Sequence, residues 1–334
     1  MGHEAGWQYS RIYDQEVIED GKVRTEEGYT TELWTRKGIQ FMEQNKDEPF
    51  FLFLAYNGPY VLGNLMLNSP KNRHADYYKG KYFRSFPLDS MHPWQHANKQ
   101  FHNQQVAMER VAGETSGVDD GVGEIMSALK RLGLEENTLV IYTADQGWMG
   151  GQNGIWGMGD HTLPIGAHDL MMKIPMVFRQ PGRIQPGQNS DIVVSNYDFM
   201  PTLLGYLGLG KKMPKTPKSP GRDFSPVLMG APQSWDNVMY YEMETTRAIR
   251  TADWKYVTRI PNGPYELYNL KVDPQERFNM YGQPGSEAKK TELEKRLNDF
   301  FEVYADPQYD IWNGGGSKAK RFTSDTFDFS KEYF

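Results

Sequence analysis

The chain has 334 residues, a formal net charge of −6 and no cysteine. This length predicts a sizeable core and about two domains. The acidic balance argues against a nucleic-acid-binding surface. The lack of cysteine excludes disulfides, thiolate metal sites and cysteine nucleophiles.

Neither a membrane-spanning segment nor a secretory signal is expected. The longest apolar run, Phe50 to Tyr56, is far shorter than the roughly 20 residues that cross a bilayer. The residues that follow Met1 contain no basic region and no apolar region of the kind that a signal peptide needs. The sequence therefore leaves the compartment open.

The N-terminal third predicts one helix and one strand. Residues 1–30 are polar and show no clear period, so we expect them to wrap the outside of a domain. Thr31 to Glu43 has the apolar spacing of an amphipathic helix. Phe50 to Ala55 is a continuous apolar run, which predicts a central strand that ends at the polar corner containing Asn57.

Four histidines lie in the irregular stretch 61–105, namely His74, His92, His96 and His102. The spacing of His92 and His96 could be one helical turn, which would suit a zinc site. However, Pro93 argues against a helix there, and no carboxylate is suitably spaced beside them. Solvated histidines, or histidines at the rim of a substrate site, are therefore the favoured interpretation.

A second helix is predicted from apolar residues that recur at helical spacing, which are Val118, Val122, Ile125, Leu129 and Leu132. Asp119 and Asp120 would then lie in the first turn, where the helix dipole favours negative charge. We expect these two residues to start the helix rather than to bind a metal.

The stretch from Leu139 to His161 organises the rest of the chain. Leu139 to Tyr142 is typical of a buried strand, and it stops abruptly before Asp145 and Gln146. Ligands bind at the carboxyl ends of strands in open α/β sheets, so this pair is predicted to lie at the rim of a site. A glycine-rich loop with two tryptophans follows, which is unusual for a plain surface loop.

The C-terminal half predicts a strand at Ile174 to Phe178, a helix from Asp198 through Leu209, and a basic, proline-rich linker at 210–222. A small antiparallel sheet is then expected from four short apolar pieces, at 238–243, 247–249, 254–258 and 266–268. A helix over 288–304 would cover that sheet. The conformation of the tail at 306–334 is left open.

The segment TADQGWMGGQNGIWGMGDHT, followed by KIPMVFRQPGRI, resembles the central metal-binding segment of the sulfatase family, within the alkaline-phosphatase-like superfamily. Residues 49–60, 116–143 and 247–280 agree with that family in order and spacing. The resemblance implies an α/β fold with a mixed, mainly parallel sheet flanked by helices, and a small C-terminal antiparallel-sheet subdomain. The expected domains are a truncated catalytic domain at 1–230, an α+β subdomain at 231–305 and the tail.

The resemblance also implies a metal site. Sulfate-ester hydrolysis needs a divalent cation, an in-line nucleophile and groups that stabilise charge on the sulfuryl oxygens. Asp145 and Gln146 match half of the family's metal site, although the second ligand there is usually Asn or His. Their oxygen atoms suit Ca²⁺, with Mg²⁺ possible.

Residues expected to bind the substrate are Asn57, Tyr60, Trp156, His161 and Lys173. Tyr60 stands where the family commonly carries a histidine, and Met158 stands where it carries a lysine after the glycine-rich loop. His161 is favoured over Lys173 to compensate for that lysine, because it lies in the same loop. His161 is accordingly the one candidate catalytic residue.

The other half of the family's site is missing from this sequence. No cysteine is present, and no Ser-x-Pro-x-Arg segment occurs, since residues 69–73 read SPKNR and residues 85–89 read SFPLD. We therefore expect the chain to correspond to the C-terminal part of a sulfatase, inactive alone for want of the formylglycine nucleophile. A missing segment would also leave a raw sheet edge, so the isolated chain is expected to be poorly soluble or oligomeric.

Three functions stay open. The first is hydrolysis of a sulfated carbohydrate or aryl sulfate, in a family whose full-length members are often exported. The second is a catalytically inert remnant or a binding scaffold. The third is a related phosphoesterase, which would need several His and Asp ligands, whereas only His161 and His168 lie near the predicted rim.

Overall fold

The computed structural model describes residues 2–4, 12–59 and 66–317. The chain divides into two compact units that alternate along the sequence. The first unit comprises residues 1–90, 98–140 and 150–154, and the second comprises residues 91–97, 141–149 and 155–334. Within the described residues, no helix is long and apolar enough to cross a bilayer.

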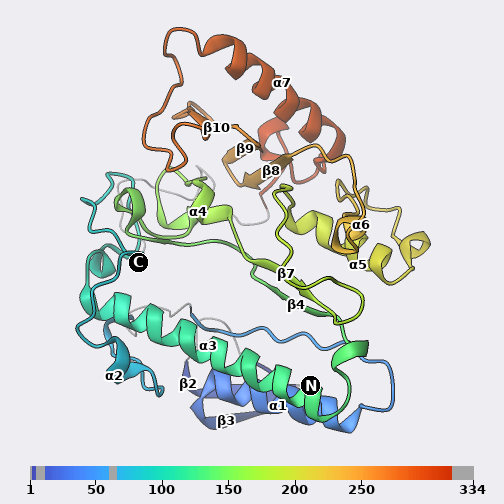
Figure 1. The fold of residues 1–334 in the computed structure, drawn as a ribbon. Coiled ribbons are helices and arrows are strands. Elements are labelled where there is room, and N and C mark those ends of the chain that lie inside the picture. Colours follow the sequence, from blue (N-terminus) through green and yellow to red (C-terminus); the bar gives the residue numbers. More distant parts are fainter. Residues whose placement is uncertain (1, 5–11, 60–65, 318–334) are drawn as a thin grey trace. The chain divides into compact units, whose positions relative to one another are not determined.

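Two helices, α1 (Thr30–Gln44) and α3 (Gln105–Arg131), lie side by side in the first unit (Figure 1). Their shared core contains Met42, Ala128 and Leu129. A one-turn helix, α2 (Ala75–Tyr78), also contacts α3. The predicted helix at 31–43 is therefore confirmed.

The helix α3 begins at Gln105, thirteen residues before the predicted start at Val118. The extra turns contain Gly113 and Gly117, which lower helix propensity. A Cβ atom at Gly117 would lie 2.3 Å from the hydroxyl of Tyr29, so the glycine is needed for close packing. Tertiary contact thus overrides local preference here.

Asp119 and Asp120 consequently lie in the middle of α3, and their prediction as helix-start residues was wrong. Asp120 instead forms an ion pair with Arg73, and its Oδ2 lies 2.7 Å from His74 Nε2. The Arg73 guanidinium holds the pKa of the Asp120 carboxyl below its usual range. Asp120 therefore fastens the segment before α2 to α3.

An antiparallel sheet precedes α1, where the sequence showed no period. Its strands, in the order β1-β2-β3, are β1 (Gly2–Glu4), β2 (Tyr13–Glu19) and β3 (Lys22–Tyr29). Asp20 and Gly21 form the turn between β2 and β3, with φ of 52° and 76°. An Asp-Gly pair is a strong hairpin signal, and it was the available clue.

The predicted strand at Phe50 to Ala55 was wrong, because no strand is assigned there. Phe50 and Leu52 pack against the core of α1 and α3. Phe51 and Phe53, which alternate with them, are each 76% exposed. The segment thus has the alternation of a strand but no ladder partner among the described residues of its unit.

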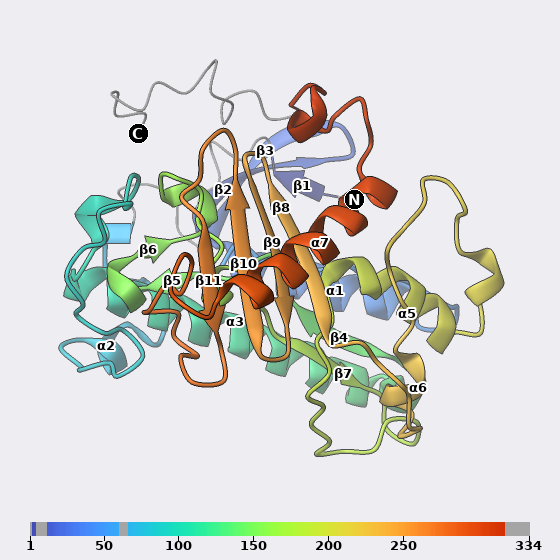
Figure 2. The same ribbon diagram turned by 90° about the horizontal axis from the view of Figure 1, so that it is seen from above.

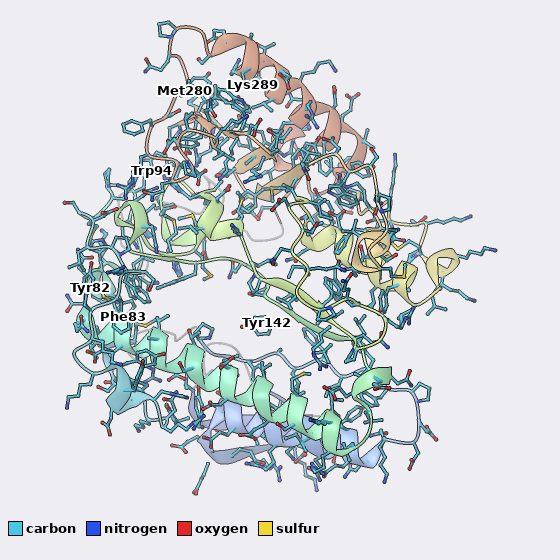
Figure 3. All side chains as sticks on the ribbon, viewed as in Figure 1. Tyr82, Phe83, Trp94, Tyr142, Met280 and Lys289 are labelled. Atoms are coloured by element: carbon cyan, nitrogen blue, oxygen red, sulfur yellow. The ribbon has the colours of Figure 1, made fainter. Side chains whose placement is uncertain are left out.

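The strand β4 (Val140–Thr143), which belongs to the second unit except for its first residue, pairs with β7 (Met176–Arg179), and this confirms two predicted strands to within two residues. The predicted burial of β4 was wrong, because no residue of the strand is fully buried and Tyr142, labelled in Figure 3, is 42% exposed. Four short elements also follow β4 along the chain, and these are β5 (Met149–Gly150), β6 (Trp156–Gly157), α4 (Asp169–Met172) and α6 (Ser225–Leu228). The predicted helix after Asp198 is α5 (Phe199–Tyr206).

The C-terminal antiparallel sheet is confirmed, with strand order β11-β10-β9-β8. Its strands are β8 (Val238–Met243), β9 (Thr246–Thr251), β10 (Trp254–Arg259) and β11 (Glu266–Asn269). Figure 2 shows α7 (Glu287–Tyr304) lying across this sheet. Ile249, Tyr256 and Leu267 from the sheet form one core with Leu293 and Leu297 from α7.

The first residues of the tail fold back onto the sheet. Arg247 on β9 forms an ion pair of 2.7 Å with the buried Asp310. The same guanidinium lies 3.8 Å from the ring centroid of Phe301 and 4.8 Å from that of Trp312. The tail is therefore fixed as far as residue 317, and residues 318–334 lie outside the described residues.

Candidate functional site

Asp145 and Gln146 lie just past the end of β4, with Ala144 between, and both side chains are exposed. The Gln146 N–H donates to Asp145 Oδ1 at 2.9 Å, which fixes the carboxylate relative to the next peptide. The Asn196 side-chain amide donates to the Asp145 carbonyl oxygen at 3.1 Å. The pair thus lies at the end of a strand, as predicted, with its backbone held from outside the loop.

Gly147, which follows Gln146, ties the C-terminal end of this pair to α4. Its N–H donates to the Met171 carbonyl oxygen at 3.0 Å. A Cβ atom at this position would lie 2.2 Å from the Leu170 carbonyl oxygen and 2.8 Å from that of Lys173. The loop can therefore approach α4 this closely only with glycine at residue 147.

Lys173 is exposed and follows α4 directly. The contact of Gly147 with α4 brings the backbone of Lys173 close to the loop that carries Asp145 and Gln146. The structure thus brings three of the predicted site residues into one region of the second unit, while the substrate role of Lys173 stays a prediction.

His161 ends a 3-10 helix, Gly159–His161, and is only 8% exposed. Its Nδ1 accepts the Met158 N–H at 3.2 Å, so the proton of the neutral ring lies on Nε2. That Nε2 lies 4.0 Å from Asp160 Oδ1. The ring fills the space beside Gly157, whose φ is 135° and which leaves no room for a Cβ atom. His161 is therefore held in one orientation with a donor nitrogen beside a carboxylate.

Trp156 is fully buried rather than at a rim. Its backbone N–H and carbonyl oxygen both bond to the Gln95 side chain, at 2.8 and 3.0 Å. Its ring lies edge-on to Trp148, with centroids 4.8 Å apart. The observed contacts of Trp156 are those of a packing residue, and its substrate role stays a prediction.

Two predicted substrate residues cannot be related to this region. Asn57 belongs to the other compact unit, where its Oδ1 accepts the Trp34 indole N–H at 3.3 Å. Tyr60 lies outside the described residues. Both assignments stay predictions.

A buried ionic cluster beside α4 was missed from the sequence. Lys255 on β10 has no exposed surface, and its Nζ donates to the Ala167 carbonyl oxygen at 2.7 Å. The same Nζ lies 2.7 Å from Asp169 Oδ1 and also forms an ion pair with Glu276. Burial alone would raise the pKa of Asp169, but the ammonium of Lys255 and the guanidinium of Arg250 hold that pKa below its usual range.

His168 lies next to this cluster and is 5% exposed. Burial lowers the pKa of His168 to about 4, although the nearby Glu266 carboxylate opposes the shift. Glu266 itself is paired with Arg259 and accepts the Tyr268 hydroxyl at 2.7 Å. The available signal was that Lys255 and Arg259 lie an even number of positions apart along a strand, which places both on the same face as the apolar Val257.

The sulfatase family model matches residues 2–209, and the model for the C-terminal region of N-sulphoglucosamine sulphohydrolase matches residues 165–302. The chain belongs to the sulfatase family. An N-acetylglucosamine-6-O-sulfatase of Bacteroides thetaiotaomicron is 24% identical over 374 aligned positions, covering 88% of this sulfatase-family chain and 65% of the relative. Arylsulfatase K of Xenopus laevis is 27% identical, covering 82% of the chain and 57% of the relative. The chain thus spans between about half and two thirds of these relatives.

Solved structures confirm the sulfatase fold. A protein in complex with its substrate, D-glucosamine-2-N,6-O-disulfate, aligns with a TM-score of 0.71 at 22% identity, covering 95% of the chain and 77% of that protein. A phosphonate monoester hydrolase from Silicibacter pomeroyi aligns with a TM-score of 0.67 at 20% identity, covering 92% of the chain and 68% of that protein. Since this fold carries more than one chemistry, the function of this sulfatase-family chain has to be argued from its site.

The sulfatase family implies a divalent cation, and the donors at the end of β4 suit one in kind. Asp145 offers a carboxylate and Gln146 an amide oxygen, both exposed to solvent. Calcium takes about six to eight oxygen ligands, so the other ligands would be water, substrate or further protein oxygens. Among the described residues, no group of three or more His, Cys, Asp or Glu side chains is placed to hold a metal ion. The histidines at 92, 96 and 102 therefore form no such group.

Proposed function

We propose that this chain carries the cation-binding and substrate-binding part of a sulfuric ester hydrolase that acts on a sulfated carbohydrate. The observation that carries the proposal is the exposed Asp145–Gln146 pair at the carboxyl end of β4 in a sulfatase-family chain. The names of the relatives support the substrate class, because they include an N-acetylglucosamine-6-O-sulfatase and an endo-4-O-sulfatase.

The proposed ligands are Asp145 and Gln146, and the proposed ion is Ca²⁺, or Mg²⁺ in its place. A divalent cation bound there would withdraw charge from the sulfate oxygens as the ester bond breaks. His161 is proposed to donate a hydrogen bond from Nε2 to the substrate, and Lys173 to add positive charge.

We further propose that the 334 residues bind this substrate without turning it over. The reaction needs a nucleophile in line with the leaving group, and the sequence contains neither cysteine nor a Ser-x-Pro-x-Arg segment. Binding, rather than catalysis, is therefore the first property to measure.

The test compares thermal unfolding of the wild-type chain with and without Ca²⁺ or Mg²⁺, together with Asp145→Asn and the control Asp253→Asn. Asp253 is exposed and belongs to the same unit. A cation at one hundred times its dissociation constant should stabilise the wild type and the control by about 2.7 kcal/mol, and Asp145→Asn by far less. Equal stabilisation of all three chains would refute the assigned ligands.

Turnover assays on the same samples separate the alternatives. We expect no sulfate release from sulfated N-acetylglucosamine or from an aryl sulfate. Sulfate release would contradict the proposed lack of a nucleophile, and phosphate release from a phosphate ester would favour the phosphoesterase. Failure to bind either the cation or the sulfated sugar would favour an inert scaffold.

A further inference from the structure

We infer that Lys255 and Asn196 are positioning residues, through which the C-terminal part of the second unit holds the Asp145–Gln146 pair in place. The expected effect on cation affinity rests on the proposed function. The mechanical part of the inference rests only on contacts within the second unit.

The first contact path starts at Gly147. Its N–H donates to the Met171 carbonyl oxygen at 3.0 Å, and the missing side chain lets the loop lie directly on α4. Any movement of α4 therefore moves the residue that follows Gln146. What fixes α4 also fixes one end of the proposed ligand pair.

The sheet fixes α4 through the buried cluster. Lys255 binds both the Ala167 carbonyl oxygen and the Asp169 carboxylate, each at 2.7 Å. The Asp169 backbone N–H donates to Glu276 Oε2 at 2.6 Å, and Arg250 lies 3.3 Å from the Asp169 carboxylate. The start of α4 is thus held through both its side chain and its backbone.

The segment before α4 is held on the same face of the sheet. The Ile165 carbonyl oxygen accepts the Thr246 hydroxyl at 3.1 Å and the Arg259 Nε–H at 2.9 Å. Ala167 packs against Ala248 and Val257. Lys255 therefore holds residues 167 and 169 in a row of contacts that begins at residue 165.

The second contact path starts at Asn196, whose amide donates to the Asp145 carbonyl oxygen at 3.1 Å. Asn196 begins a 3-10 helix that ends at Asp198, a carboxylate with no exposed surface. That carboxylate accepts the N–H groups of Ser195 and Arg222, at 2.9 and 2.8 Å. Arg222 also donates to the Asp236 carbonyl oxygen at 2.7 Å.

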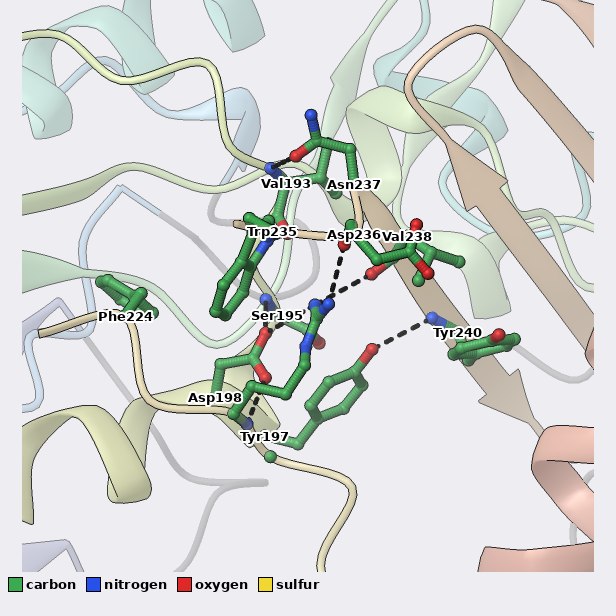
Figure 4. A network of polar contacts seen from close by, with 12 residues as sticks. Val193, Ser195, Tyr197, Asp198, Phe224, Trp235, Asp236, Asn237, Val238 and Tyr240 are labelled. Carbon is green, nitrogen blue, oxygen red and sulfur yellow. Dashed lines mark hydrogen bonds and ion pairs between the residues drawn. The ribbon is translucent and has the colours of Figure 1, made fainter. Parts of the chain in front are cut away.

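This second path also reaches β8. Arg222 donates to the Val238 carbonyl oxygen at 3.1 Å, and the Tyr240 N–H donates to the Tyr197 hydroxyl at 3.3 Å (Figure 4). Trp235 donates from its indole to the Val193 carbonyl oxygen at 2.8 Å. Both ends of the sequence Asp145-Gln146-Gly147 are thus tied to elements that reach the C-terminal sheet.

Metal ligands must be held close to their productive geometry, and residues that orient them affect affinity without touching the metal. Neither Lys255 nor Asn196 is a proposed ligand. Loss of either should therefore loosen the loop first and weaken cation binding as a result.

The experiment measures amide hydrogen exchange at Gly147 and Ca²⁺ affinity by calorimetry, both on the full chain. The variants are Asn196→Ala and Lys255→Met, with Lys295→Met as the matched control. Lys295 is 74% exposed in an ion pair with Asp299 on α7. We expect exchange at Gly147 to rise roughly fivefold in Asn196→Ala, which corresponds to the loss of one hydrogen bond. Calcium affinity should fall about tenfold or more in both variants and stay unchanged in the control.

The two readouts distinguish the inference from the proposed function. Unchanged Gly147 exchange in Asn196→Ala would overturn the inference, whatever happens to calcium. Faster exchange in a chain that does not bind calcium even as the wild type would support the positioning contacts and refute the proposed cation. If Lys255→Met does not fold, Asn196→Ala alone decides, because its side chain is exposed and its loss leaves no buried charge.

Discussion

The two faces of the C-terminal sheet bury side chains of opposite chemistry. Along β10, Tyr256 contacts the apolar core under α7, while its neighbours Lys255 and Val257 face the segment that leads into α4. The α7 face is held mainly by Leu293, Leu297 and aromatic rings, and it carries one buried ion pair, Arg247–Asp310. The opposite face is held mainly by ion pairs and hydrogen bonds to backbone carbonyls.

This difference separates stability from placement. Apolar burial is non-directional, so the α7 face stabilises the fold without prescribing atomic positions closely. A buried charge is costly unless its partners lie at the correct distance and angle, so the ionic face prescribes where residues 165–169 lie. The loop with the proposed ligands contacts α4 through Gly147, and α4 is held by this ionic face of the sheet.

The largest expected effect comes from breaking the ionic face at Lys255. The Lys255→Met variant would leave the carboxylates of Asp169 and Glu276 buried without their shared cation. We expect the free energy of unfolding to fall by about 3–5 kcal/mol, measured by urea denaturation. A loss below about 1 kcal/mol would mean that this face does not depend on its charges.

The apolar face should lose stability without a local effect on the loop. Leu297→Ala removes a side chain that is 1% exposed, and we expect a loss of about 2–5 kcal/mol in the same assay. After correction for global stability, amide exchange at Gly147 should match the wild type. A selective increase at Gly147 would show that both faces position the loop, and the contrast would fail.

The ionic face should also respond to pH through His168. The pKa of His168 is about 4 in the folded chain and about 6.5 in the unfolded chain, mainly because burial disfavours the charged ring. Lys255, His92 and Arg259 lower this pKa further, whereas the Glu266 carboxylate raises it. The unfolded chain binds the extra proton between these values, so this stability is complete above about pH 6.5 and is lost as the pH falls towards 4.

The loss attributable to His168 is about 3 kcal/mol at most. It is measured as the difference between wild type and His168→Leu in denaturation curves at pH 7, 5.5 and 4. The variant should lose less stability than the wild type over that range. Parallel curves for both chains would show that titratable groups other than His168 control the acid response.

The smallest effect is expected at an exposed ion pair on the outer side of α7. Lys295→Ala removes a charge that lies 2.6 Å from Asp299, with both side chains more than half exposed. Solvent and salt screen such pairs, so unfolding should change by less than about 0.5 kcal/mol. A larger loss would place Lys295 in the packing of α7 and disqualify it as a control.

The apolar face could be predicted from sequence, and the ionic face could not. Leu293 and Leu297 recur at helical spacing, so the covering helix was visible. Lys255 and Arg259 sit in a strand where charged residues usually face water, and only the fold supplies their partners. The sequence shows that both side chains share one face of the strand, but not that the carboxylates of residues 169 and 276 lie beside Lys255.

The candidate site shows the same limit. The position of Asp145 and Gln146 just past the end of a strand could be predicted, because an apolar run and a polar stop adjoin in sequence, whereas their role as metal ligands stays a prediction. The role of Asn196 could not be predicted, since it reaches Asp145 across 51 positions of the chain. The start of α3 was misplaced because the need for glycine at residue 117 depends on Tyr29, which is even more remote in sequence.

The contacts of Arg247 with Asp310 and Trp312 determine how far the chain can be shortened from its C-terminus. The helix α7 ends at Tyr304, and the sequence pattern places the domain boundary close to that residue. Asp310 and Trp312 lie beyond it, yet they neutralise and cover a guanidinium that is only 6% exposed. A stop after Tyr304 would leave that cation buried with Glu242 as its remaining carboxylate partner, so a stable shortened chain should keep residue 312.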